Sequence, residues 1–191
     1  MAELRPVHDP KLLRAIAHPL RNRILTELEA SGSLRAADIA RVLDVPANQA
    51  SFHLRQLAKY GLVEEDAAAA RDKRDRVWRT TSAAALDVDL GTLEKAPGGK
   101  AASAVFRKNK AAWNHDIVDA AYSDDRPEGT VRSIGEFALK LTRDEARQLS
   151  DEVSALLQGW ADRTRGTDPE RRTYLMLSII QPHPDVPREG D

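Results

Sequence analysis

Seven polar side chains recur on one side of a helix that we expect between residues 47 and 59. They are Asn48, Gln49, Ser51, His53, Arg55, Gln56 and Lys59. Amide side chains can pair with base edges through two hydrogen bonds, and positive side chains can bind phosphate oxygens. These residue types therefore favour contact with double-stranded DNA. A helix face that is merely solvated is the alternative. For any single residue, especially Phe52 or His53, this alternative fits about as well.

The other side of this helix is apolar. Ala50, Leu54 and Leu57 recur at i, i+4 and i+7, which predicts one narrow buried stripe. A shorter amphipathic helix is expected over residues 36–43, with a break at residues 44–46. Two short helices joined by a tight turn, the second with a polar outer face, predict a helix-turn-helix. The second helix would lie in the major groove of DNA.

The flanking segments extend this motif. Helices are expected over residues 11–18 and 19–30, with Pro19 suited to a first helical turn. After Gly61 the pattern changes to strands at residues 62–65 and 76–80. A basic loop joins the two strands, and this arrangement predicts the wing of a winged helix. The wing residues that could reach DNA are Arg71, Lys73, Arg74 and Arg76. Interleaved aspartates leave an ordinary solvated loop as the alternative.

Residues 11 to about 81 resemble the ArsR family of bacterial winged-helix regulators. The resemblance rests on His18-Pro19-Leu20-Arg21, Ile24-Leu25, Asp38-Ile39-Ala40, Ser51-Phe52-His53-Leu54, Leu57 and Gly61-Leu62-Val63. It implies a homodimer that represses transcription by occupying an operator. It also implies that Ser51 and His53 contact DNA.

Metal sensing, for which this family is best known, is not expected here. The two positions that carry cysteines in the thiolate sensors correspond to Arg35 and Ala37, and the chain has no cysteine. A second type of family site uses Asp and His on a C-terminal helix, and its nearest candidates are His115, Asp116 and Asp119. A His–Asp pair one turn apart is more often a surface ion pair. We expect no metal and no cofactor.

The rest of the chain is less familiar. We expect a helix over residues 100–122 and a βαβ unit with parallel strands at 131–141 and 173–180. Thr142 and Glu145 form a capping box for its helix, residues 142–165. Two strands are too few for a stable sheet, so they could pair across a dimer. The aromatic residues there fit core and interface packing better than a ligand pocket; they are Phe106, Trp113, Tyr122, Phe137, Trp160 and Tyr174.

Composition fits a two-part regulator. Residues 1–82 carry 14 Lys and Arg against 11 Asp and Glu, whereas the remainder carries 15 against 19. The chain has neither an apolar run of membrane-spanning length nor a signal peptide, so we expect a cytoplasmic protein. The five histidines are scattered, and the segment at residues 97–100 lacks the spacing of a phosphate-binding loop, so no enzyme is expected.

The predicted fold class is mainly α with small β elements. A winged helix-turn-helix over residues 1–82 is followed by a linker at 83–99, an α/β dimerisation region at 100–181 and a disordered tail at 182–191. The predicted function is sequence-specific regulation of transcription. Two alternatives stay open: a one-component sensor with a small-molecule effector site in the C-terminal region, and a winged helix that binds proteins and not DNA.

Overall fold

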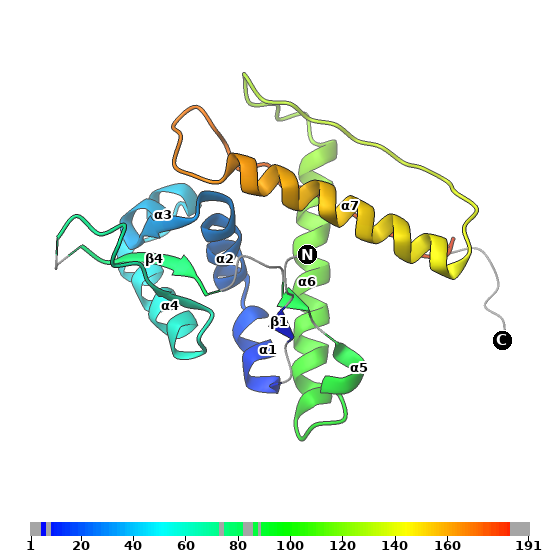
Figure 1. Ribbon diagram of the computed structural model, residues 1–191, viewed down its shortest axis with the longest axis horizontal. Coiled ribbons are helices and arrows are strands. Elements are labelled where there is room, and N and C mark those ends of the chain that lie inside the picture. The colour runs from blue at the N-terminus through cyan, green and yellow to red at the C-terminus, as the bar shows by residue number, and fades with distance from the viewer. Residues whose placement is uncertain (1–4, 7–8, 73–74, 82–85, 88, 184–191) are drawn as a thin grey trace.

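Figure 1 shows a computed structural model in which residues 5–6, 9–72, 75–81, 86–87 and 89–183 are described. The described part of the chain is mainly helical. Its helices are α1 (Pro10–Ile16), α2 (Pro19–Ser31), α3 (Ala36–Leu43), α4 (Ala47–Lys59), α5 (Leu90–Leu93), α6 (Gly99–Tyr122) and α7 (Arg143–Thr164). Its strands are β1 (Arg5–Pro6), β2 (Ser33–Arg35), β3 (Val63–Glu65), β4 (Val77–Thr80) and β5 (Leu86–Asp87).

The helix starts follow the signals in the sequence. The Asp9 side chain accepts a hydrogen bond of 2.8 Å from the backbone N–H of Lys11 at the start of α1. At α7 the predicted capping box is present. The N–H of Glu145 donates to Thr142 Oγ1 at 3.3 Å, and the N–H of Thr142 donates to Glu145 Oε2 at 2.7 Å. Local side chains therefore fix both helix starts.

The turn between α3 and α4 is made by three residues. Asp44 has a φ of 51°, which places it in the left-handed region that Asp tolerates better than most residues. The N–H of Val45 donates to the carbonyl of Ala40 at 3.0 Å. Pro46 then precedes α4 and supplies its fixed φ. This turn sets the angle at which α4 leaves α3.

One hydrophobic core joins α1 to α4, the small sheet and the start of α6. Its fully buried side chains include Leu13, Ile24, Leu28, Ile39, Leu54, Leu57 and Leu93. The predicted apolar stripe of α4 lies in this core, because Ala50, Leu54 and Leu57 are all buried. The polar side of α4 is consequently turned outward.

The wing is an antiparallel sheet in the order β2-β4-β3. Its register pairs Ser33 with Arg79 and Val63 with Thr80. The two strands predicted after Gly61 are confirmed. The third strand, β2, begins two residues after the end of α2, in a segment where the sequence predicted no strand. Its backbone pairs with β4 and its Leu34 is buried against the core.

The segment predicted as a linker, residues 83–99, contains structure where it is described. β5 pairs with β1, and α5 buries Leu93, which is 1% exposed. The helix predicted over residues 100–122 is confirmed as α6, which packs along α1. There the Asn109 Nδ2 donates to the carbonyl of Ala17 at 2.9 Å. The first half of α6 therefore belongs to the same packed unit as the winged helix.

The two strands predicted for the C-terminal region are wrong for the single chain. Residues 131–141 and 173–180 have no regular secondary structure, although α7 between them forms as predicted. Their apolar side chains are exposed, as Phe137 at 88% shows most clearly. A strand needs a neighbour for its backbone hydrogen bonds, and neither segment has a ladder in this chain. Most of the predicted disordered tail, residues 184–191, lies outside the described residues.

Truncation of a buried side chain on α4 and of an exposed one on α3 should affect stability very differently. Leu54→Ala opens a cavity in the core and should lower the free energy of unfolding by about 2–5 kcal/mol. Val42→Ala is the control, because Val42 is 51% exposed on α3, and it should change the free energy by less than about 0.5 kcal/mol. Urea unfolding measures both. Equal losses in the two variants would mean that α4 does not bury this stripe.

Candidate nucleic-acid interface

The polar side of α4 forms an exposed edge of the molecule. Figure 1 shows α4 beside the wing, on the side of the winged helix away from α6 and α7. Asn48, Gln49, Arg55 and Lys59 are exposed, and Ser51 and Gln56 are partly buried. Six of the seven residues predicted on α4 therefore lie at or near the surface. They present amide, hydroxyl and positive groups over about three turns of helix.

The first turn of α4 carries the two amide side chains. The Asn48 Oδ1 accepts a hydrogen bond of 2.9 Å from the backbone N–H of Gln49. This bond holds the Asn48 side chain near the helix N-terminus, while Gln49 extends into solvent. Helix N-termini enter the major groove in this motif, and the backbone N–H groups there favour phosphate. Both amide side chains are therefore exposed in the first turn of α4.

His53 differs from its neighbours because it is only 7% exposed. Its ring packs against the ring of His18, with 4.6 Å between the ring centroids, and against Phe52 at 5.2 Å. Burial lowers the pKa of His53, and the nearby His18 and Arg21 lower it further. Burial and Arg21 also lower the pKa of His18. The structure thus makes His53 part of the packing between α4 and the start of α2.

Phe52 is the residue of α4 that the sequence did not assign to the interface. Half of its surface is exposed, and it lies between the polar residues of the outer face. An apolar side chain in this position can contact the methyl group of thymine. The sequence signal that could have added Phe52 to the predicted interface is its position between Ser51 and His53, which were both assigned to it.

Of the predicted wing residues, the structure describes Arg71 and Arg76, and only Arg76 has an ion pair with a carboxylate side chain among the described residues. Arg76 Nε lies 3.5 Å from Glu65 Oε1 on the neighbouring strand, so its charge is partly compensated. Arg71 is exposed, and its backbone N–H donates to Asp75 Oδ2 at 3.1 Å. That hydrogen bond is the main cause that lowers the pKa of the Asp75 carboxyl. Lys73 and Arg74 lie outside the described residues.

Arg35, at one of the two positions compared with the thiolate sensors, has a structural role. Arg35 Nε lies 2.7 Å from Asp75 Oδ1, and this ion pair joins the start of α3 to the wing. The candidates His115, Asp116 and Asp119 are all exposed on α6. The described residues contain no group of three or more His, Cys, Asp or Glu side chains that could hold a metal ion.

The aromatic side chains of the C-terminal half do not gather in one pocket. Phe106 and Trp113 line a cavity of about 20 Å³ between α6 and the start of α2, together with Ile16 and Pro19. That volume holds about one water molecule. The remaining aromatic residues of the predicted set are exposed; they are Tyr122, Phe137, Trp160 and Tyr174. Among the described residues, no helix combines the length and the apolar character needed to cross a bilayer.

Comparison with known proteins identifies the motif. Residues 16–66, about a quarter of the chain, match the family model for a helix-turn-helix domain. This range contains α2, α3, α4 and β3, and therefore the whole polar face of α4. The match covers only this part of the chain. No curated protein sequence matches the chain.

Three solved structures are similar to the chain at low levels. A double mutant of Lactococcus lactis ZitR in apo form is 17% identical, covers 75% of this chain and 83% of its own, and has a TM-score of 0.32. A MarR family transcriptional regulator from Silicibacter pomeroyi is 18% identical over 80% of each chain, with a TM-score of 0.33. NMB1585, a MarR family regulator from Neisseria meningitidis, is 19% identical over 75% of this chain and 76% of its own, with a TM-score of 0.32. These scores are too low to establish a shared overall fold or function.

The contact between the partly exposed His18 and the buried His53 is expected to make stability depend on pH. The folded pKa values of His18 and His53 lie below 6.5, so the unfolded chain binds more protons below that pH. The free energy of unfolding should therefore fall as the pH is lowered from about 7 through the unfolded value near 6.5 toward the lower folded values. His53→Gln should weaken this dependence, as urea titrations between pH 5 and 8 will measure. His115→Gln, on the exposed surface of α6, is the control and should leave it unchanged. If wild type and His53→Gln show the same pH dependence, the contact between His18 and His53 is not the cause of that dependence.

Proposed function

We propose that the protein is a sequence-specific DNA-binding regulator of transcription. The observation that carries the proposal is the division of α4 into a buried stripe and an exposed face of amide and positive side chains. That face lies beside a wing, in the part of the chain that matches a helix-turn-helix domain. In this motif the second helix reads base edges in the major groove. Cytoplasmic location follows from this proposal, because the operator is chromosomal DNA.

The two parts of the exposed face take different tasks in this proposal. Asn48 and Gln49, in the first turn, read base edges, with adenine as the base that suits an amide. Arg55, Gln56 and Lys59, further along α4, bind the phosphate backbone and fix the register. Ser51 lies between the two groups and can donate to either. His53 supports α4 from behind through its contact with His18.

The finer assignment is a dimeric repressor of the ArsR type. The resemblance of residues 11 to 81 supports it, and so does the size of the face on α4. One recognition helix contacts only a few base pairs, whereas two related by a two-fold axis contact half-sites about 34–36 Å apart. A dimer bound in this way at a promoter would exclude the polymerase from that promoter. Neither a metal nor a cofactor takes part in this proposal.

Base reading by the first turn of α4 can be separated from general affinity for DNA. The operator is first obtained by selecting bound duplexes from a random library. The double variant Asn48→Ala, Gln49→Ala should then lose about 1–3 kcal/mol per bidentate pair on this operator, and much less on random DNA. Arg55→Ala is the matched control, because removal of a phosphate-binding charge weakens both alike. Gel-shift titrations at fixed salt measure the ratio. An equal loss on both DNAs in the double variant would exclude base reading.

The positive side chains of the wing should contribute to the salt dependence of DNA affinity. Combined neutralisation of Arg71, Lys73 and Arg74 should reduce the log–log slope of affinity against salt by about 0.9 for each phosphate that the wing no longer neutralises. Arg76→Ala should have a smaller effect, since Arg76 is already paired with Glu65. Titrations between roughly 50 and 200 mM salt compare the variants. An unchanged slope in the triple variant would place the wing outside the interface. Absence of any salt-dependent DNA affinity in the wild-type protein would instead favour a protein-binding winged helix.

A further inference from the structure

The segment from Thr173 to Gln181 is uncharged, apolar and exposed. Met176 is 68% exposed and Ile179 is 64% exposed, although the run has the β-branched and aromatic content of a strand. Its apolar residues occupy both faces of an extended chain, since Leu175 and Ile179 alternate with Met176 and Ile180. An exposed segment of this composition is an aggregation hazard. We therefore expect another part of a folded assembly to cover it.

Residues 131–141 have a different charge pattern. Arg132, Glu136 and Lys140 are spaced by four residues and so lie on one face of an extended chain. Charged side chains of this kind protect the outer strand of a sheet from further pairing. A strand that is apolar on both faces is typical of the centre of a sheet. If both segments belong to one sheet, the two charge patterns indicate that 131–141 is an edge strand and 173–180 a central strand.

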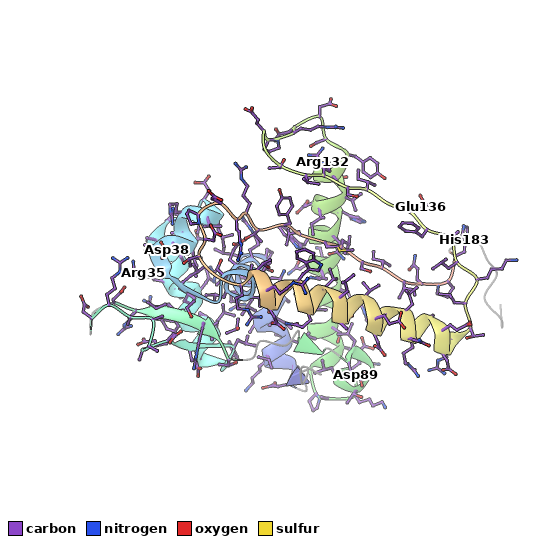
Figure 2. The ribbon with its side chains drawn as sticks, turned by 45° about the horizontal axis from the view of Figure 1, so that its top comes forward. Arg35, Asp38, Asp89, Arg132, Glu136 and His183 are labelled. Atoms are coloured by element: carbon purple, nitrogen blue, oxygen red, sulfur yellow. The ribbon has the colours of Figure 1, made fainter. Side chains whose placement is uncertain are left out.

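The structure already places the two segments in the right direction for one sheet. The N–H of Val131 lies 3.3 Å from the hydroxyl oxygen of Tyr174 and donates to it. This contact joins the beginnings of the two segments. Figure 2 shows both of them running along α7 toward its N-terminal end, where His183 lies. Parallel strands need a crossover of a dozen or more residues, and the 22 residues of α7 supply it.

Among the described residues after α6, none is buried. α7 has no buried residue in the part described, and its Leu156 and Trp160 are 61% and 56% exposed. The part of this region that follows α6 contacts the winged helix at few places, one of which is the hydrogen bond of 2.9 Å from Thr173 Oγ1 to Glu27 Oε2. Two strands and one helix bury too little apolar surface to be stable alone. A second copy doubles the unit to four strands and two helices.

We propose that residues 173–180 pair antiparallel with the same residues of a second copy of this chain. The sheet order is then 131–141, 173–180, 173–180 of the second copy and 131–141 of the second copy. The uncharged strands meet at the two-fold axis, and the charged strands form the two outer edges. Self-pairing of 131–141 about Glu136 would instead oppose Glu136 to itself and Arg132 to Lys140. The inference rests on the proposed function for its two-fold axis.

The absence of cysteine from the chain gives a direct test. Single cysteines are introduced into the full-length protein at each position from 174 to 180 and oxidised without DNA. In an antiparallel pair about a two-fold axis, one step along the strand separates the two copies of a residue by about 7 Å. A disulfide needs the two Cβ atoms within about 4.5 Å. Cross-linked dimer should therefore peak at one position or two adjacent ones, and fall at least tenfold on either side.

Matched controls are Arg132→Cys and Glu136→Cys on the predicted edges, which should give no cross-linked dimer. A peak at these edge positions, equal cross-linking at every position from 174 to 180, or none at any of them would overturn the pairing. A second measurement guards against variants that misfold. Met176→Lys with Ile180→Lys should raise the dimer dissociation constant at least tenfold in sedimentation equilibrium, while Lys140→Ala should leave it unchanged. A wild-type protein that sediments as a monomer would also overturn the proposal.

The result of the cross-linking experiment does not depend on whether the protein binds DNA. The expected cross-linking peak in a protein that fails to bind DNA would overturn the proposed function and leave this interface standing. Operator binding by a protein without the peak would overturn only the interface. The two inferences can therefore fail separately.

Discussion

The two-sided character of α4 is the constraint on which the rest of the structure depends. Ala50, Leu54 and Leu57 must be buried so that the opposite face is held rigidly toward solvent. Three elements pack against α4: α2, α3 and strand β3 of the wing sheet. His53 lies at the border of the buried stripe of α4. Its ring therefore faces the neighbouring helix and contacts the ring of His18. Burial of this stripe therefore fixes both the core and the orientation of the polar face.

The core of the winged helix continues into α6. Leu93 and Ala102 are buried with the helices of the motif, and Asn109 is bound to the end of α1. A change in the position of α6 would have to disturb these contacts. The C-terminal region follows directly from α6, so its placement is coupled mechanically to that of α4.

The sequence predicted the elements whose signals are local. The stripe of α4, the break at Asp44 and the capping box at Thr142 each depend on residues within one or two turns, and the structure contains all three. The short strand β2 was missed because its pairing with β4 joins residues more than 40 positions apart. The burial of His53 was also missed, since it depends on His18 in another helix. The roles of the polar residues on α4 remain predictions.

The strands predicted at 131–141 and 173–180 are absent from the single chain for a different physical reason. Their composition is right for strands, but β-propensity describes fitness for a pleated, half-buried surface and not an intrinsic backbone state. One chain provides neither the neighbouring ladder nor the buried face. If two copies provide both, α6 and the shared sheet together set the distance between the two α4 helices. The spacing of the operator half-sites would then be determined at residues 173–180, far along the chain from the polar residues of α4 that we propose to read the bases.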